Sequence, residues 1–200
     1  IILQQTQVKQ GLPYYEAFVK TYPTIFDLAN ATEQEVLKLW QGLGYYSRAR
    51  NLHTTAKHIA FNLDGEFPNN YKDLLKLKGV GDYTASAIAS IAFNEVAAVV
   101  DGNVYRVLSR YFGIDTPINS TSGTKEFKKL ASSLIDREQP ATFNQAIMEF
   151  GARQCKPKNP DCSICPLQDC CVALQKSLVE TLPVKLKKTK VTNKYFNFLV

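Results

Sequence analysis

The sequence predicts an all-α protein. Nearly every segment before residue 180 spaces its apolar residues on one face of a helix, and strand-like alternation occurs only at the extreme C-terminal end. Cap residues and glycine stops also recur where these helical patterns begin and end. The chain has 200 residues, 45% hydrophobic and 21% charged, which is enough for one or two compact units.

The first clear helix start is a capping box. Thr32 and Glu35 have the spacing that lets each side chain bond to the backbone of the other residue. An apolar helical pattern follows over 36–40, and Gly42 and Gly44 end it. The pattern then predicts a second helix over 48–61.

The two ends of the sequence predict a longer parent protein. Ile1, Ile2 and Leu3 resemble the middle of a helix, so we expect residues upstream. Residues 195–200 resemble the first strand of a further domain, after a lysine-rich stretch.

The centre of the chain predicts two helices joined by a glycine turn. Asn70 can cap a helix over 71–77, and the turn at 79–81 has the sequence Gly-Val-Gly. A helix over 82–93 follows. Two glycines allow a tight turn that leaves backbone N–H groups free near a helix N-terminus, where a phosphate can bind.

Asp101 stands where the next helix, over 103–111, needs its N-cap. We expect this helix to pack beside the one over 82–93, so that Tyr83 and Asp101 face one groove. Further helices are expected over 125–137 and 141–152, and the latter leads directly into a group of cysteines.

Charge favours a polyanionic partner and excludes a membrane span. The net charge is +6, and each Lys or Arg set against a phosphate releases a condensed counterion. The longest weakly polar run, at 79–100, is interrupted by Asp82, Asn94 and Glu95. We expect a monomeric intracellular protein, of the bacterial cytoplasm or nucleoid.

All five cysteines lie within 17 residues, 155–171. An odd count in a chain that can bury its own core disfavours a disulfide scaffold and favours a metal centre with four thiolate ligands. Cys162 and Cys165 form one Cys-x2-Cys pair, with six residues between Cys155 and Cys162 and five between Cys165 and Cys171. This spacing fits a [4Fe-4S] cluster better than zinc, which usually takes two Cys-x-x-Cys pairs. Spacing alone leaves Cys170 and Cys171 as alternatives for the fourth ligand.

The glycine hairpin, the Asp101-Gly-Asn-Val sequence and the cysteine loop, in this order, resemble the endonuclease III superfamily of DNA glycosylases. Within it, the segments 2–8, 39–50 and 143–146 are similar to the A/G-mismatch adenine DNA glycosylases, the MutY family. The resemblance covers almost the whole chain.

The resemblance implies a helix-hairpin-helix glycosylase fold with a six-helix barrel lobe over 1–116 and an iron-sulfur cluster lobe over 117–182. Residues 183–200 would be a basic linker and the first strand of a C-terminal domain. The family's cysteine spacing selects Cys171 over Cys170 and implies a [4Fe-4S] cluster bound by Cys155, Cys162, Cys165 and Cys171.

Cleavage of an N-glycosidic bond puts positive charge on the sugar, and a nearby carboxylate stabilises it. Asp101 is the candidate, although it could serve only as a helix cap. Asn103 would hold the backbone or Asp101. In the family a glutamate that would precede Ile1 protonates the departing base.

Tyr83 occupies the position at which bifunctional relatives carry a lysine. A lysine amine can form a Schiff base with the sugar, whereas a phenol cannot. The resemblance therefore implies a monofunctional enzyme. As an alternative, Tyr83 is simply an aromatic residue packed in the first turn of a helix.

An adenine inside a duplex must be turned out of the helix before the reaction. In the family the Gln-Gln-Thr segment and the first tyrosine of Gly-Leu-Gly-Tyr-Tyr enter the DNA, and Gln145 suits an adenine edge. Arg48 and Arg106 would meet phosphate or lie on an exposed helix face. The candidate DNA-binding residues are Leu3, Gln5, Thr6, Tyr45, Arg48, Gly79, Val80, Gly81 and Gln145.

The sequence thus predicts a glycosylase that hydrolyses the bond to adenine mispaired with 8-oxoguanine or guanine in double-stranded DNA. One alternative is a bifunctional glycosylase and lyase for oxidised pyrimidines. Another is a non-catalytic iron-sulfur module that binds DNA.

Overall fold

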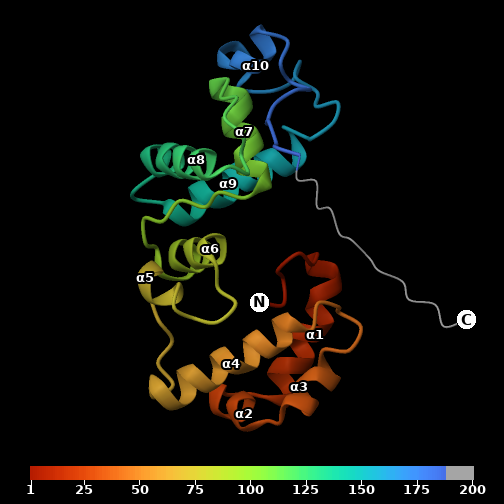
Figure 1. The fold of residues 1–200 in the computed structure, drawn as a ribbon, viewed down its shortest axis with the longest axis vertical. Helices are drawn as coiled ribbons and strands as arrows, with labels where there is room; N and C mark the ends of the chain where they lie inside the picture. The colour runs from red at the N-terminus through yellow and green to blue at the C-terminus, as the bar shows by residue number, and fades with distance from the viewer. Residues whose placement is uncertain (188–200) are drawn as a thin grey trace, which may run out of the picture. The chain divides into compact units, whose positions relative to one another are not determined.

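The structure is a computed structural model that describes residues 1–187, and every regular element within them is helical (Figure 1). The all-α prediction is confirmed. Two compact units are present: Ile1–Val99 with Ile135–Asn144, and Val100–Leu134 with 145–187. The expected lobes, 1–116 and 117–182, use other boundaries and stay a prediction, and the expected strand at 195–200 lies outside the described residues.

Four helices form the first part of the first unit: α1 (Val8–Thr21), α2 (Ile25–Asn30), α3 (Glu33–Leu39) and α4 (Ser47–Asn62). The long helix α4 packs against α2 and α3 (Figure 1). Their core is a cluster of buried apolar side chains that includes two residues of the predicted pattern over 36–40. Its members are Phe18, Val36, Trp40, Leu43 and Ala49.

Local sequence explains where these helices begin. The expected capping box at Thr32 and Glu35 is present, with backbone and side chain bonded in both directions. A second capping box, which the sequence analysis missed, joins Thr24 and Asp27 at the start of α2. Each box satisfies backbone N–H groups that the first helical turn leaves without partners.

The expectation that Ile1–Leu3 continue a helix is wrong. Residues 2–5 form a turn, and α1 begins only at Val8. Gln5 has a φ of 52°, in the left-handed region, which a right-handed helix excludes.

The helices α5 (Tyr71–Leu74) and α6 (Asp82–Phe93) follow in the first unit, which also contains the start of α9 (Pro140–Arg153). Asn70 caps α5 as predicted, but α5 ends at Leu74, earlier than expected. Leu77, before the turn, and Val80, in the middle of it, are buried in one cluster with Ile59 of α4. This packing ties the glycine turn to the core.

The second unit contains α7 (Gly102–Phe112), α8 (Thr121–Leu134), the later part of α9 (Pro140–Arg153), the 3-10 helix η1 (Gln168–Cys170) and α10 (Val172–Gln175). The helix α7 packs against α8 and α10. The helix expected over 125–137 begins four residues earlier, at Thr121, and ends at Leu134. Across residues 1–187, no helix is both long and apolar enough to cross a membrane.

Candidate functional site

The turn between α5 and α6 is the predicted hairpin. Gly79 has a φ of 81°, and a Cβ there would lie 2.7 Å from Cβ of Asn51 on α4, so the position requires glycine. Gly81 is the N-cap of α6 and provides no side-chain cap. Helix N-termini attract anions through their N–H groups and the helix dipole, so this end of α6 suits a phosphate. Val80 is buried, so only its backbone can face a ligand.

The segment that precedes α1 is bonded to this hairpin. Nε2 of Gln4 donates to O of Gly79 at 2.9 Å and lies 3.2 Å from Oγ1 of Thr84. The neighbouring Leu3 is exposed and Thr6 is half-buried. The hairpin and the N-terminal turn therefore form one continuous surface in the first unit.

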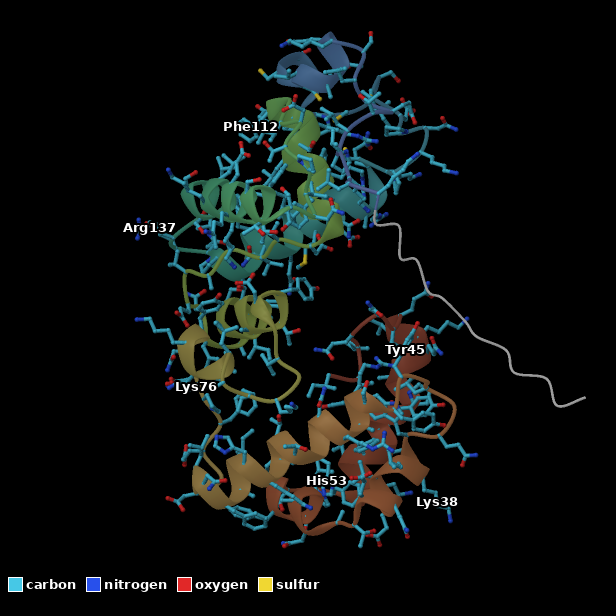
Figure 2. All side chains as sticks on the ribbon, in the orientation of Figure 1. Lys38, Tyr45, His53, Lys76, Phe112 and Arg137 are labelled. Atoms are coloured by element: carbon cyan, nitrogen blue, oxygen red, sulfur yellow. The ribbon has the colours of Figure 1, made fainter. Side chains whose placement is uncertain are left out.

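An open cavity of about 430 Å³ opens on this surface. It brings together four of the predicted site residues from distant parts of the sequence. Tyr45 is labelled in Figure 2. It is 70% exposed and, like Gln5, has a left-handed backbone, with a φ of 47°. The cavity is lined by Gln4, Gln5, Tyr45, Ser47, Arg48 and Tyr83.

Arg48 differs from what the sequence suggested. Its side chain is buried and donates hydrogen bonds to main-chain carbonyls, so the exposed-face interpretation is wrong. The same correction holds for Arg106 in the second unit, which is also buried. A contact between Arg48 and DNA phosphate stays a prediction.

Tyr83 lies in the first turn of α6, and 44% of it is exposed. The residue before it, Asp82, accepts a hydrogen bond from the hydroxyl of Tyr71. Burial and this bond to Asp82 raise the pKa of Tyr71 to about 12. Tyr71 is therefore a neutral donor at physiological pH, and it fixes the start of α6.

Asp101 is the N-cap of α7, as predicted. Its Oδ1 accepts from the backbone N–H groups of Asn103 and Val104, at 2.9 and 2.8 Å. Its Oδ2 accepts from Nδ2 of Asn103 at 2.9 Å. Asn103 thus holds Asp101 through both backbone and side chain.

Arg106 extends this arrangement toward the cysteines. Its Nη2 donates to Oδ1 of Asn103 at 2.9 Å and to O of Gly151 at 2.6 Å, and its Nε donates to O of Cys155 at 2.6 Å. Burial lowers the pKa of Arg106. Arg106 lies three positions after Asn103 on the same helix, and this spacing, which brings two helical side chains together, was the available signal for the contact.

Tyr83 belongs to the first unit and Asp101 to the second. The expectation that they face one groove therefore stays a prediction. Gln145 is exposed on α9, which leaves its amide accessible.

The neighbouring Asn144, which the sequence analysis did not select, is buried in the first unit. Its side chain accepts from the backbone of Val99 at 3.0 Å and donates to Ser90 and Ala97. Its role is to fix the segment between α6 and Val99.

The cysteine segment gathers thiols that form no disulfide. Burial raises the pKa of Cys162, and the neighbouring Cys165, Cys171 and Cys155 raise it further. Cys170 is exposed, whereas the other four are half-buried. Among residues 1–187, no three or more Cys, His, Asp or Glu side chains are arranged so that they could hold a metal ion together.

Arg110, one turn after Arg106, links the two ends of the cysteine segment. Its Nη1 lies 3.4 Å from Sγ of Cys155, and its carbonyl oxygen lies 3.6 Å from Sγ of Cys171. Its guanidinium also donates to carbonyls in this unit, including that of Lys156 at 2.7 Å. Arg110 therefore contacts both the first and the last predicted ligand. Four half-buried thiols offer the soft donors that iron-sulfur clusters require.

Residues 1–135 match the HhH-GPD superfamily of base excision DNA repair proteins. The chain belongs to this superfamily. Among solved HhH-GPD relatives, a thermostable thymine-DNA glycosylase is 31% identical, with a TM-score of 0.80 over 88% of this chain and 81% of that one. A non-covalent endonuclease III–DNA complex is 26% identical, with a TM-score of 0.75 over 88% of this chain and 82% of that one.

Sequence relatives confirm the resemblance to adenine DNA glycosylases. The adenine DNA glycosylase of Buchnera aphidicola subsp. Baizongia pistaciae is 41% identical over 100% of this chain and 57% of its own length. Those of Mus musculus and Homo sapiens are 47% and 46% identical over 88% and 91% of this chain. This HhH-GPD chain spans 34% of the length of each mammalian relative.

Proposed function

We propose that the protein is an adenine DNA glycosylase that hydrolyses the N-glycosidic bond of adenine mispaired with 8-oxoguanine or guanine. The observation that carries the proposal is the carboxylate of Asp101, held on both oxygens, in a chain 47% identical to the adenine DNA glycosylase of Mus musculus. The net charge of +6 suits double-stranded DNA as the partner.

Asp101 is proposed as the catalytic carboxylate. As adenine leaves, positive charge develops on the deoxyribose ring, and a fixed negative charge nearby stabilises it. Such a group is most effective when it is held in place before the reaction, so that no reorganisation is required. The bonds from Asn103 and Val104 provide this restraint.

Tyr83 supports a hydrolytic, monofunctional reaction. A lyase needs an amine that attacks the sugar and forms a Schiff base, and a phenol cannot do so. The exposure of Tyr83 on the cavity surface suits a contact with the DNA sugar or base.

The DNA is proposed to bind across the hairpin surface of the first unit. The start of α6 at Gly81 would hold a backbone phosphate. Gln5 and Tyr45 would enter the base stack, because their side chains are exposed beside the cavity. In the second unit, Gln145 offers both a donor and an acceptor for an adenine edge.

Cys155, Cys162, Cys165 and Cys171 are proposed to hold a [4Fe-4S] cluster, with Cys170 outside it. The cluster would supply four iron–thiolate bonds that cross-link the segment. In the proposed hydrolysis the residues of this segment only maintain the shape of the second unit, through Arg106 and Arg110.

The test is a single-turnover reaction of the full-length protein with duplexes that contain adenine opposite 8-oxoguanine, with and without borohydride. We expect free adenine, an intact abasic strand and no covalent protein–DNA adduct. An efficient borohydride trap would favour the bifunctional enzyme instead. Tight duplex binding without base release would favour a non-catalytic module.

A further inference from the structure

Two exposed residues of the cavity share an unusual backbone conformation. Gln5 and Tyr45 have φ values of 52° and 47°, in the left-handed region that residues other than glycine rarely adopt. Neither is an asparagine or aspartate, the residues that tolerate this region best. Such conformations cost free energy and persist only where the surrounding structure imposes them, often at functional sites.

One side chain reaches the backbone beside both residues. Nη1 of Arg48 donates to O of Ile2 at 3.0 Å and also to O of Gln4, which directly precedes Gln5. Nη2 lies 3.4 Å from O of Gly44, which directly precedes Tyr45. A single guanidinium therefore joins the two left-handed segments, which lie 40 positions apart in the sequence.

Further contacts hold Arg48 itself in place. Its Nη1 also donates to Oγ1 of Thr6 at 2.9 Å, and its Nη2 lies 3.3 Å from O of Leu43. The guanidinium lies over the ring of Trp40 at 5.2 Å and over that of Tyr45 at 5.7 Å. Both ring contacts are within the range of cation–π attraction.

The position is a costly one for a charge. Arg48 is 8% exposed, and its hydrogen-bond partners among the described residues are neutral oxygen atoms. Burial of a cation without a carboxylate partner is unfavourable. The planar fork of an arginine, unlike a lysine, can serve two backbone segments at the same time.

We propose that Arg48 is a positioning residue that holds Gln5 and Tyr45 in left-handed conformations, so that an amide and a phenol ring meet DNA as a fixed pair. This inference rests on the proposed function, because it assigns the pair to the recognition of a mispair. Arg48 itself acts from the interior, through the two exposed residues. Its loss should therefore affect discrimination between duplexes more than general affinity for DNA.

The test compares Arg48→Lys and Arg48→Gln with the parent protein, at a temperature where thermal melts show each variant folded. The quantity measured is the ratio of Kd values for a matched duplex and for a duplex with adenine opposite 8-oxoguanine. We expect each variant to lose about 10²-fold in this ratio, as misplaced recognition groups commonly do. Arg50→Met is the matched control, because Arg50 lies on the same helix but forms an exposed ion pair with Glu33.

A double-mutant cycle separates positioning from general structural support. The same Arg48 changes are made in a protein that carries Gln5→Ala and Tyr45→Ala. If Arg48 acts through these two residues, its replacement there should change the ratio by no more than about twofold. An equal loss in both backgrounds, or no loss in the parent background, would overturn the proposal. Failure of the parent protein to release adenine would count against the proposed function, whereas the binding ratios would still test Arg48.

Discussion

Thr32 in the first unit and Asp101 in the second are both helix N-caps, yet their side chains are used differently. The hydroxyl of Thr32 accepts from the backbone N–H of Glu35, and the backbone N–H of Thr32 donates to the Glu35 carboxylate. Thr32 and Glu35 are both exposed. Asp101 also accepts from two backbone N–H groups of its helix, but its second oxygen accepts from the side chain of Asn103.

The difference shows which cap does more than begin a helix. A cap needs one acceptor oxygen for the N–H groups of the first turn. The second oxygen of Asp101 adds nothing to capping, but its bond to Asn103 fixes the plane of the carboxylate. Asn103 is in turn held by Arg106, which is buried. A carboxylate held by Asn103, which is itself held by Arg106, is suited to stabilising charge on a substrate.

The largest effect is expected for Asp101→Asn. Asparagine caps helices about as well as aspartate, so the start of α7 should be retained while the negative charge is lost. We expect adenine release to fall about 10³-fold, as when other electrostatic transition-state groups are removed. Single-turnover excision, with duplex affinity measured in parallel, tests this expectation, and near-normal excision would show that Asp101 is only a cap.

A smaller effect is expected for Gly151→Ala, which acts on the residue that orients Asp101. Alanine normally favours a helix interior by about 1 kcal/mol over glycine. Here a Cβ would lie 2.7 Å from Cβ of Asn103 and 2.9 Å from its carbonyl oxygen. We expect the protein to lose about 1–3 kcal/mol of stability, as overpacked sites do.

Thermal unfolding measures this cost, and Gly102→Ala is the control, because a Cβ at Gly102 meets nothing within 4 Å. We also expect excision to fall, by up to about 10²-fold, as Asn103 is displaced. Equal stability of the two variants would contradict the close contact between α9 and α7.

The smallest effect is expected for Thr32→Ala, which removes a cap without a catalytic role. The loss should be about 1 kcal/mol of stability, with unchanged excision by the folded protein. Backbone and hydroxyl bonds from Thr32 lower the pKa of Glu35. A lowered folded-state pKa stabilises the protein above the unfolded-state pKa, so this part of the effect should shrink as the pH falls through the acidic range. Urea unfolding at neutral and acidic pH measures it, and a cost that grows in acid would contradict the capping box.

Local signals predicted much of the fold. The caps at Thr32, Asn70 and Asp101 and the helix over 82–93 are confirmed, because each depends on a few adjacent residues. The turn before α1 was not predicted. Its apolar residues have a spacing that predicts a helix. The side chain that holds the turn belongs to Arg48, which lies more than 40 positions away in the sequence.

The residues of the candidate site were selected from separate motifs, and their grouping was not predicted. The cavity brings together Gln5, Tyr45 and Tyr83, whereas the expected groove shared by Tyr83 and Asp101 stays a prediction. The burial of Arg48 and Arg106 was not predicted. The residues next to an arginine in the sequence do not reveal whether carbonyl groups from distant segments surround its side chain. The sequence pattern allows Arg48 and Arg106 to lie on an exposed helix face, whereas both side chains are buried in the structure.

The most direct test of the account measures excision and stability together for Asp101→Asn and Thr32→Ala in the full-length protein. The two variants alter the same kind of cap, so stability alone cannot separate them. We predict that Asp101→Asn loses adenine release by about 10³-fold while its unfolding free energy falls no more than that of Thr32→Ala. A loss of excision that is proportional to the loss of unfolding free energy in both variants would contradict a catalytic role for Asp101.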